Sequence, residues 1–532
     1  MKDTTDVIEH TEEVLPPQQN LQPQDKAAQF LSQVGVEATF TPEEEKEVLK
    51  RIDRRVLPLI LGAYFFQQLD KSSLSYVSIF GIVEHASLHG KQYSWLGSIL
   101  YLAQLVFQPL VAFLLVKYPT GKLLAGAIFF WGSSLTIMSA CTNFPSLLGL
   151  RFCLGTFEAF IAPICVVVTQ MWWRRSEQTL RNSFWNGMNG VTAIVGSLVT
   201  YGLGHIHSRV LFEYQIIFMF CGLLTVVYSI VVLVLMPDSP MEAKYLSQRD
   251  KVVAVERLRA NQQGVASRKW RWDHVWEVAL DPKTYLWFLL IIAISIPSGG
   301  ISTFGSLIVK SFGYSAFAAI LFNIPFGVIQ IVAIIGSAAV ATKWKRKGFV
   351  ITIASIFPIV GTIILLTVPR HQKGVLLFGY YLISCLACIT PLVYAWHIQN
   401  TAGDTKRKCT SAVVFIGMCA GNVIGPLLYS TDQAPEYRPG LISNLIMFAL
   451  VGVLAIIITL YLQLLNKRHA AQRTAVGKNA EKIDESMIGK DKIGHAKTIE
   501  LENGQASNDA QTEDKGFADV TDLKNEDFIY VY

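Results

Sequence analysis

Long apolar stretches separated by short polar segments dominate the chain between residues 57 and 465. A helix that crosses a bilayer needs about 20 largely apolar residues. Stretches of this kind predict twelve spanning helices, at approximately 57–81, 94–116, 122–141, 146–170, 183–205, 213–236, 284–308, 317–341, 348–368, 375–397, 410–430 and 441–465. The pattern therefore predicts an all-α polytopic membrane protein.

The longest internal loop, 237–283, divides these helices into two sets of six. That division is typical of transporters built from two six-helix repeats, with a site near the membrane midplane between them. Within the loop, residues 247–262 have the apolar spacing of a short amphipathic helix, which suits a surface strut or a brace between the halves. We predict an acidic, disordered N-terminal tail, two six-helix bundles joined by a cytosolic linker, and a disordered C-terminal tail, at 1–55, 56–236, 237–283, 284–465 and 466–532.

Lys and Arg are distributed unevenly between the loops on the two sides of the predicted helices. The loops after helices two, four, six, eight and ten hold twenty-one of them, and the opposite loops hold six. Cytosolic loops carry the excess of these residues. Both tails are therefore predicted to face the cytosol. The net charge of +6 arises mostly from these cytosolic loops, so it indicates the orientation of the chain in the membrane rather than nucleic-acid binding.

The composition agrees with a membrane protein and leaves no soluble enzyme domain. Hydrophobic residues make up 52% of the chain and charged residues 16%, against about 25% charged in soluble domains. The eight cysteines fall mostly in or beside apolar segments, where cysteine behaves as a small hydrophobe. Cys385 and Cys388 form a CxxC spacing without supporting ligands, so we expect helix packing rather than a metal or redox site. No cofactor or metal is expected.

Four ionisable residues lie inside predicted spans: Asp70 and Lys71 in the first, Arg151 and Glu158 in the fourth. A charge at the bilayer centre costs about 2.5–3.5 kcal/mol even on lenient scales, so each marks a candidate functional site. Arg151 and Glu158 are seven residues apart and share one helical stripe. Asp70 can lie between them if the two helices pack together, whereas Lys71 points about 100° away from Asp70, free to meet a substrate anion. A static salt-bridge cluster is the alternative, but apolar residues would serve a purely structural role better.

Several uncharged residues are weaker candidates. Tyr64, Gln67 and Asn422 are compatible with lining the site or with hydrogen bonding between helices. The glycine- and proline-containing stretch 297–300 permits either a broken helix facing a cavity or an ordinary kink. Gln104 is expected to hydrogen-bond neighbouring helices.

The chain resembles the major facilitator superfamily, and within it the fungal allantoate-permease branch of the anion:cation symporters. The segments that carry the resemblance are RFCLGTFEAF at 151–160, MWWRRSEQTLR at 171–181, MPDSPMEAKYLSQRD at 236–250, ERLRANQQG at 256–264, IPSGGISTFGSLI at 296–308, NTAGDTKRK at 400–408 and GNVIGPLLYSTDQAPEYRPG at 421–440. The tail ending TDLKNEDFIYVY is also similar to that branch.

The resemblance implies a major facilitator fold and roles for the four charged residues. Asp70 and Glu158 match the positions of proton-coupling carboxyls, and Lys71 and Arg151 match the anion-binding bases. Relatives commonly place Arg where this chain has Lys71, and lysine lacks the guanidinium fork that fits a carboxylate. Lys71 is therefore expected to fix the orientation of a bound carboxylate less closely than an arginine at this position would.

These observations predict a monomeric plasma-membrane permease that imports a small organic anion with protons by alternating access. The resemblance suggests ureido acids, vitamins, small peptides or sulfur compounds as substrates, and the sequence does not choose among them. A proton-driven exporter of drugs or metabolites is the first alternative, although the fifth span lacks the Gly-Pro pair typical of drug antiporters. A non-transporting nutrient sensor is the second. Retention of all four charges argues against a sensor.

Overall fold

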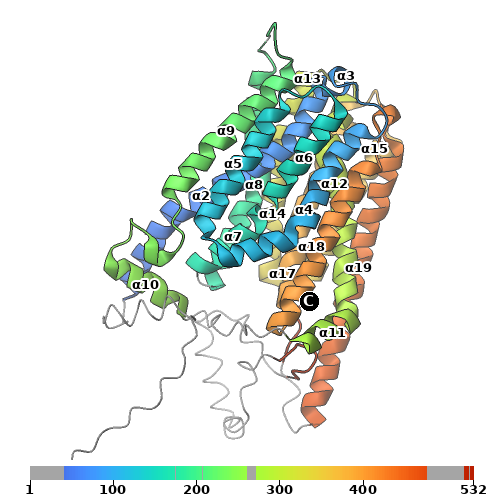
Figure 1. Cartoon of the computed structure of the whole chain (residues 1–532). Coiled ribbons are helices and arrows are strands. Elements are labelled where there is room, and N and C mark those ends of the chain that lie inside the picture. The colour runs from blue at the N-terminus through green and yellow to red at the C-terminus, as the bar shows by residue number, and fades with distance from the viewer. Residues whose placement is uncertain (1–40, 174, 207, 260–270, 476–519, 527) are drawn as a thin grey trace, which may run out of the picture.

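Helices are the only regular structure in the part of the chain that the computed structural model describes, residues 41–173, 175–206, 208–259, 271–475, 520–526 and 528–532 (Figure 1). The first six spans are α2 (Pro42–Ile79), α4 (Gln92–Lys117), α5 (Thr120–Met138), α6 (Phe144–Glu158) with α7 (Ile161–Trp172), α8 (Arg175–Leu203) and α9 (Glu213–Leu235). The second six are α12 (Pro282–Lys310), α13 (Ala316–Leu321) with α14 (Asn323–Trp344), α15 (Lys347–Thr367), α16 (Lys373–Ile383) with α17 (Ile389–Gln399), α18 (Asp404–Leu427) and α19 (Arg438–Ala475).

Ten of these spans, searched among the described residues, are long and apolar enough to cross a membrane by composition alone. Helices α2 and α8 complete the twelve. Helix α2 carries Asp70 and Lys71 in its apolar part, and α8 contains several asparagines, so both are more polar than the other spans. Their polarity already indicates that they face a polar interior rather than lipid.

Three spans are interrupted, each beside a proline that removes a helical hydrogen bond. Pro163 has no N–H to donate to the carbonyl of Ala159, and the fourth span breaks between α6 and α7 at that point. In the eighth span α13 ends at Leu321 and α14 begins at Asn323, and Pro325 has no N–H to donate to the Leu321 carbonyl. Pro391 stands in the same relation to Ala387, and a 3₁₀ segment (Ser384–Cys388) separates α16 from α17. The first break places Glu158 at the last residue of α6.

The helices form one elongated bundle with two distinct ends (Figure 1). At one end, here called the tail end, α2 begins, α19 finishes, and α10 (Gln248–Arg259) and α11 (Trp272–Leu280) lie outside the bundle. At the opposite end, here called the far end, lie the short helices α3 (Ile82–His85) and α13.

Hydrogen bonds join the two six-helix sets near the far end. Ser75 Oγ donates to Ser306 Oγ at 3.0 Å, which links α2 to α12. Tyr93 on α4 donates to the carbonyl of Thr303 on α12 at 2.8 Å, and Ser98 Oγ donates to the carbonyl of Val423 on α18 at 2.7 Å. These contacts hold the sets together on the far-end side of the charged residues.

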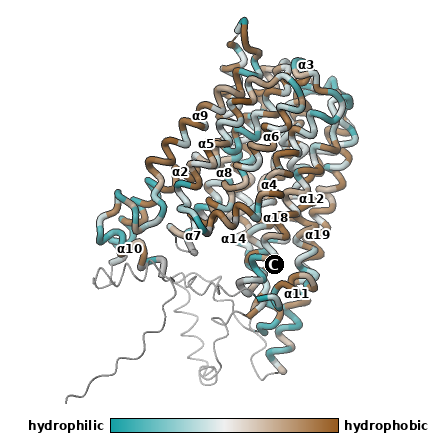
Figure 2. Tube along the Cα trace, viewed as in Figure 1, coloured by the Kyte–Doolittle hydropathy of each residue, from teal (hydrophilic) through white to brown (hydrophobic). Residues whose placement is uncertain are grey.

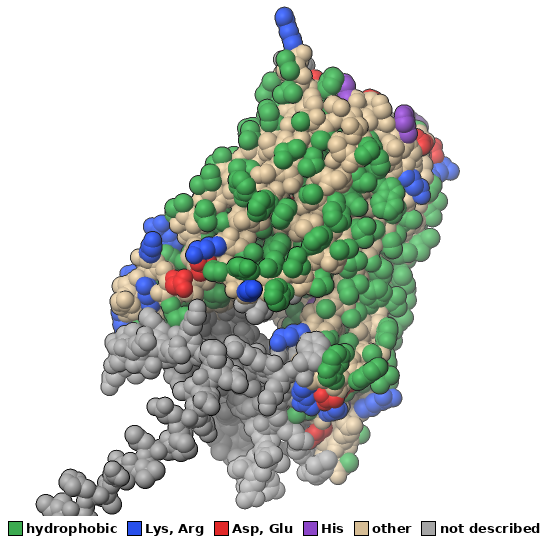
Figure 3. All heavy atoms as spheres, viewed as in Figure 1, with side chains coloured by type: hydrophobic (Ala, Val, Ile, Leu, Met, Phe, Trp, Pro, Cys, Tyr) green, Lys and Arg blue, Asp and Glu red, His purple; other side chains and the backbone are tan. Residues whose placement is uncertain are grey.

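On the face shown in Figure 3, apolar side chains are spread along the bundle and most charged side chains lie near its ends. Figure 2 shows the same distribution of hydropathy along the trace. Exposed apolar residues of the spans include Val227, Leu233, Val332, Ile335 and Leu460. A surface of this kind fits the hydrocarbon core of a bilayer, because lipid tails replace water around it.

The N-terminal boundary differs from the prediction of a disordered tail up to residue 55. Helix α2 begins at Pro42, and Thr41 caps it: Thr41 Oγ1 accepts from the Glu44 amide at 3.2 Å, and Glu44 Oε2 accepts from the Thr41 amide at 3.0 Å. This reciprocal capping box satisfies two N–H groups at the start of the helix. Residues 1–40 of the predicted tail lie outside the described residues.

The amphipathic segment predicted at 247–262 forms α10, which packs against α2 and α7 of the first bundle. Arg249 pairs with Glu44 at 3.2 Å, and Arg257 pairs with Glu177 at 2.5 Å. Among the described residues α10 therefore serves as a strut on one bundle. Helix α11 packs instead against α18 of the second bundle.

The C-terminal boundary also differs from the prediction of disorder over 466–532. Helix α19 continues to Ala475, and residues 520–526 and 528–532 pack against the tail end of the second bundle. The tail's polar composition suggested disorder, but its Asp and Tyr side chains have partners on the bundle. Residues 476–519 lie outside the described part.

Candidate functional site

A small cavity lies where the two bundles meet, on the tail-end side of the far-end hydrogen bonds. Its lining comes from α2, α4 and α6 of the first bundle and α12 of the second, namely Lys71, Leu74, Gly97, Leu100, Tyr101, Arg151, Ser302 and Thr303. Two of the four predicted charges, Lys71 and Arg151, therefore face the space between the bundles.

Arg151 is buried in this cavity without an ion-pair partner among the described residues. Its side chain is on α6 and is 1% exposed. Its Nε and Nη2 atoms are buried, and neither has a hydrogen-bond partner in the described structure. A buried charge that lacks a partner is costly, by several kcal/mol per ion even after relaxation. The guanidinium is therefore set to accept a ligand that brings negative charge or acceptor oxygens.

Glu158 lies seven residues after Arg151 on α6, and its carboxylate is bound by other residues. Lys71 Nζ is 3.8 Å from Glu158 Oε2, and Gln104 Nε2 donates to the same oxygen at 3.2 Å. The other oxygen, Oε1, is buried and has no hydrogen-bond partner among the described residues. Glu158 thus has an open acceptor atom that a proton or a ligand donor could occupy.

Lys71 is directed at Glu158, which corrects the prediction that its ammonium stands free for a substrate. Its Nζ also lies 5.5 Å from the centre of the Tyr101 ring, a cation–π geometry. The side chain retains 14% exposure. A ligand at Arg151 would therefore meet Lys71 as part of a Lys71–Glu158 pair.

Asp70 hydrogen-bonds to side chains of α5 and α9 in the described structure, and not to Arg151 or Glu158. Its carboxylate is fully buried inside the first bundle. Oδ2 accepts from Trp131 Nε1 on α5 at 2.7 Å and from Thr225 Oγ1 on α9 at 3.1 Å. Because consecutive helical residues point about 100° apart, Asp70 faces α5 and α9 while Lys71 faces Glu158.

The uncharged candidates differ in their hydrogen-bond partners in the described structure. Gln67 Nε2 lies 3.5 Å from the Glu158 carbonyl, with Gln67 Oε1 buried and unpaired in the described structure. Tyr64 faces α8 instead, where Asn189 Nδ2 donates to its hydroxyl at 3.5 Å. Asn422 donates to the Met418 carbonyl of its own helix at 2.9 Å. The structure does not bring Tyr64 or Asn422 to the four charges by hydrogen bonding.

Helix α12 runs unbroken through residues 297–300. Its glycines allow close packing instead: a Cβ atom on Gly299 would lie 2.9 Å from the Asn422 carbonyl oxygen of α18. This stretch therefore joins α12 to α18 rather than opening a helix toward the cavity.

Sequence reasoning missed Trp131, Thr225 and Tyr101 as neighbours of the charges, and placed Gln104 only as a helix contact. One signal was available for Trp131. Tryptophan in membrane proteins concentrates at the interfaces, and an indole N–H in the middle of a span needs an acceptor. Trp131 lies in the interior of α5, so a buried acceptor such as Asp70 could have been sought for it.

The twelve spans in two joined sets, with charged residues between them, define a secondary transporter fold. The profile of the family described as Major Facilitator Superfamily matches residues 60–426. The chain belongs to that superfamily, and it is a transporter rather than an enzyme. The predicted fold class is confirmed.

Relatives in fungi cover most of the chain. An uncharacterised transporter of Schizosaccharomyces pombe, C757.13, is 33% identical over 81% of this chain and 82% of its own length. The thiamine pathway transporter THI73 of Saccharomyces cerevisiae is 29% identical over 96% and 95%. The allantoate permease of the same yeast is 29% identical over 94% and 89%. The predicted relation to the allantoate-permease branch is confirmed.

Solved structures share the fold at low sequence identity. A bacterial homologue of the human lysosomal transporter Spinster, in an inward-facing and occupied conformation, aligns with a TM-score of 0.58 at 11% identity, covering 76% of this chain and 96% of its own. The xylose transporter XylE of E. coli, in a partially occluded inward open conformation, aligns with a TM-score of 0.56 at 12% identity, covering 75% and 95%. At these identities the likeness shows the fold alone.

Proposed function

We propose that this protein imports a small organic anion together with protons by alternating access. The observation that carries the proposal is the buried Arg151 guanidinium, which faces the cavity between the bundles with two unpaired N–H-bearing nitrogens. A planar guanidinium binds carboxylate oxygens in a bidentate way. An organic carboxylate at Arg151 would satisfy those nitrogens and offset the buried positive charge.

The balance of charge couples the anion to a proton. With both carboxylates ionised, Asp70 and Glu158 balance Lys71 and Arg151. An arriving anion adds one uncompensated negative charge to a poorly solvated site, and proton uptake removes that excess. Glu158 is the leading proton acceptor, because its Oε1 is unpaired and its partner Lys71 lines the cavity. Asp70 is the second carboxyl of the network, held by Trp131 and Thr225.

Proton and anion binding are then mutually favourable. Protonated Glu158 no longer attracts Lys71, so the ammonium becomes available to the anion beside Arg151. Coupling of this kind is typically worth about 1–3 kcal/mol and is reciprocal: the anion favours the proton as much as the proton favours the anion.

The far-end hydrogen bonds support alternating access with the tail end toward the cytosol. The excess of Lys and Arg in the tail-end loops favours that orientation, with both tails cytosolic. Contacts such as Ser75 with Ser306 would then close the site toward the outside. Transport requires these contacts to part while the tail ends of the bundles come together.

The proposal extends to the substrate class, the membrane and the state of assembly. The names of the allantoate permease and the thiamine pathway transporter favour a nitrogen-containing metabolite or a compound of vitamin metabolism as the substrate. The Arg151 guanidinium favours one that carries a carboxylate. We place the protein in the plasma membrane. We take it to be monomeric, because one chain supplies both six-helix bundles.

Competition uptake in cells that express the protein tests the proposal. A panel of small carboxylates, ureido acids and sulfonates would be supplied at external pH 5 and pH 7, beside cells that express Arg151→Ala. Faster uptake of a carboxylate at pH 5 that is lost in the variant is expected. Proton-driven efflux of a preloaded compound without uptake would indicate the exporter alternative. Absence of movement in either direction across the panel would favour a sensor.

A further inference from the structure

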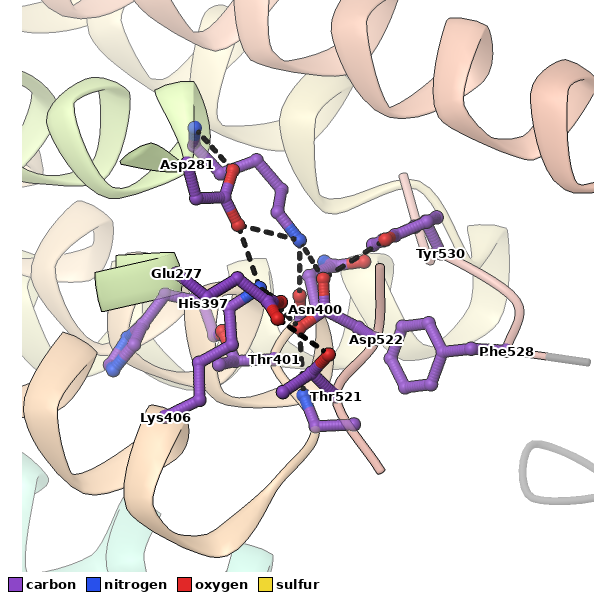
Figure 4. Close-up of polar contacts among 12 residues, drawn as sticks. Glu277, Asp281, His397, Asn400, Thr401, Lys406, Thr521, Asp522, Phe528 and Tyr530 are labelled. Carbon is purple, nitrogen blue, oxygen red and sulfur yellow. Dashed lines mark hydrogen bonds and ion pairs between the residues drawn. The ribbon is translucent and has the colours of Figure 1, made fainter. Parts of the chain in front are cut away.

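Residues 520–526 and 528–532, near the C-terminal end, dock on the tail end of the second bundle (Figure 4). We propose that this tail-end face is a peptide-recognition surface, that its occupant is this chain's own acidic and aromatic segment 520–532, and that the docked segment braces the tail ends of α12, α17, α18 and α19. The segment is named the clasp below.

Asp522 is the charged anchor of the clasp. Its side chain is fully buried. Lys283 of α12 pairs with its Oδ2 atom, and Lys406 of α18 lies 3.0 Å from its Oδ1 atom. The Ala402 amide also donates to Oδ1 at 3.2 Å. One carboxylate therefore joins the beginnings of two spanning helices.

The two lysines are shared with carboxylates of the bundle itself. Lys406 lies 2.8 Å from Glu277 Oε1 and 2.9 Å from Asp281 Oδ2, and Lys283 lies 3.5 Å from Asp281 Oδ2. When the clasp leaves, Glu277 and Asp281 remain to balance the lysines. The two ammonium groups therefore keep ion-pair partners after undocking. For this reason the clasp can be released at a low electrostatic cost.

Two asparagines of the bundle recognise the backbone of the clasp. Asn400 accepts from the Val531 amide at 2.8 Å and donates to the Val531 carbonyl at 2.9 Å. Asn466 accepts from the Tyr530 amide at 2.9 Å and donates to the Tyr530 carbonyl at 2.8 Å. An amide side chain that accepts from the N–H and donates to the C=O of one residue satisfies both backbone polar groups of that residue. Such paired contacts resemble the way in which peptide-binding domains hold an extended ligand.

Tyr530 supplies the apolar anchor. Its side chain is 1% exposed, and its hydroxyl donates to Asp522 Oδ2 at 2.9 Å. The Lys283 ammonium lies 4.5 Å from the centre of its ring. The buried ring contributes apolar contact area, and its hydroxyl contributes a directional hydrogen bond. Asp522 and Tyr530 thus form one unit that gives the surface its preference for an acidic and aromatic peptide.

The first bundle makes the corresponding joint with its own side chains. There Asp53 of α2 accepts from Trp173 Nε1 at 2.7 Å and pairs with Arg181 of α8 at 2.6 Å. In the second bundle Trp396 Nε1 donates instead to the Val531 carbonyl of the clasp at 2.8 Å. In the first bundle, side chains of the spanning helices bind one another at this junction. In the second bundle, the clasp supplies the corresponding partner.

The clasp bridges helices of the second bundle, and in alternating access their tail ends would move as one group relative to the first bundle. It contacts α12 through Lys283, the α17–α18 junction through Asn400, and α19 through Asn466. Residues 476–519 join it to α19, so its departure breaks no spanning helix. Docking therefore stiffens the second bundle at the tail end, and release loosens the same helix ends.

Thr521 identifies the position most sensitive to added charge. Its side chain is fully buried, and its Oγ1 donates to Glu277 Oε2 at 2.9 Å. A negative group at this position would face Glu277 and adjoin Asp522. Thr521→Glu should therefore release the clasp, whereas Thr521→Val should retain it, because valine keeps the shape and removes only one hydrogen bond.

Cleavage of the folded protein tests the proposal directly. A protease site would be inserted within residues 476–519 of the full chain, and the purified protein would be cut in detergent and passed through a sizing column. We expect the freed C-terminal fragment to stay with the membrane domain and to exchange with an added synthetic peptide, VTDLKNEDFIYVY. Loss of the wild-type fragment on cleavage would overturn the proposal.

Variants in the fragment identify the contacts. Asp522→Ala, Tyr530→Ala and Thr521→Glu should weaken retention at least tenfold. Lys524→Ala is the matched control: the Lys524 side chain is 57% exposed and makes only long ion pairs, at 3.8 Å to Glu277 and 3.9 Å to Asp273. Because exposed ion pairs contribute little, this variant should change retention far less than Asp522→Ala. Equal retention of wild type and Asp522→Ala would overturn the assigned recognition.

The bracing role has a separate readout. After the freed C-terminal fragment has been washed away from a cleaved Asp522→Ala protein, the membrane domain should melt at a lower temperature. Addition of the wild-type synthetic peptide should restore the melting temperature. An unchanged melting temperature on release would overturn the brace. These readouts need no transported substrate, so they stand or fall independently of the proposed transport.

Discussion

Lys71 Nζ lies 3.8 Å from Glu158 Oε2, and this pair joins α2 to α6 at the edge of the cavity that Arg151 faces. The preceding residue, Asp70, is directed into the first bundle, where Trp131 and Thr225 bind it. Two adjacent charges on one helix therefore have different neighbours. The Asp70 contacts fix the rotation of α2, and that rotation directs Lys71 toward Glu158.

Replacement of Glu158 with glutamine should abolish pH-driven accumulation and leave some exchange of substrate. Glutamine keeps a side-chain oxygen for Gln104 but cannot bind and release a proton in the working range. Accumulation against a pH gradient and exchange at equal pH would be measured in the same vesicles. Accumulation in the variant that follows pH as in wild type would contradict the role of Glu158.

The two bases should differ in their tolerance of exchange. Arg151→Lys should weaken transport at least tenfold, because an ammonium cannot replace the guanidinium fork. Lys71→Arg should be tolerated, because the longer planar cation can still reach Glu158 across the present 3.8 Å. Initial uptake rates of both variants at matched expression provide the measurement. The opposite order of effects would contradict the assignment of the anion to Arg151.

Removal of the indole N–H that binds Asp70 should destabilise the first bundle. A hydrogen bond to a charged group contributes about 1.5–3 kcal/mol, so Trp131→Phe should lower the melting temperature. Trp172→Phe is the matched control, since Trp172 is equally buried and its Nε1 has no hydrogen-bond partner in the described structure. Equal losses in the two variants would show that packing alone, not the Asp70 bond, is responsible.

Close packing of α12 on α18 predicts a steric effect at Gly425. A Cβ atom there would lie 2.2 Å from the Ile296 carbonyl oxygen, so the helices must move apart. Gly425→Ala should destabilise by about 1–3 kcal/mol, as overpacking does. Gly336→Ala should be neutral or stabilising, because nothing lies within 4 Å of its added Cβ. Thermal unfolding of the two variants is the measurement.

The clasp should remain docked across the physiological pH range. Burial acts to raise the pKa of Asp522, but Lys283 and Lys406 outweigh it and hold that pKa below its ordinary value. A lowered pKa in the docked state means that the contribution of Asp522 is complete above its ordinary pKa and is lost only as pH falls through the docked pKa. Retention of the cleaved fragment should be equal at pH 5 and pH 8. Release at pH 5 would contradict this account.

Much of the fold could be predicted from sequence, because a bilayer requires long apolar helices and constrains little else locally. The three interruptions lie beside prolines, but Pro297 and Pro358 stand inside helices that continue without a break, so proline alone does not locate them. Docking of the tail could not be predicted in this way. Composition reports whether a segment can form its own core, not whether Asp522 and Tyr530 will find partners on a distant surface.

The candidate site was predicted in part. Spacing along a helix indicated that Arg151 and Glu158 share a stripe, and the intramembrane charges marked α2 and α6. The rotation of α2 relative to α6 depends on contacts with Trp131 and Thr225 from two other helices. For that reason the sequence did not reveal that Lys71 forms an ion pair with Glu158 while Asp70 is bound by Trp131 and Thr225.

The central claim is that anion and proton bind interdependently at Arg151, Lys71 and Glu158. It is tested most directly by the affinity of the purified protein for its transported anion, measured between pH 5 and pH 8 in wild type and in Glu158→Gln. A coupling of about 1–3 kcal/mol predicts an affinity roughly 5- to 150-fold higher at the acidic end in wild type, with little pH dependence in the variant. Wild-type affinity that does not change between pH 5 and pH 8 would contradict the account.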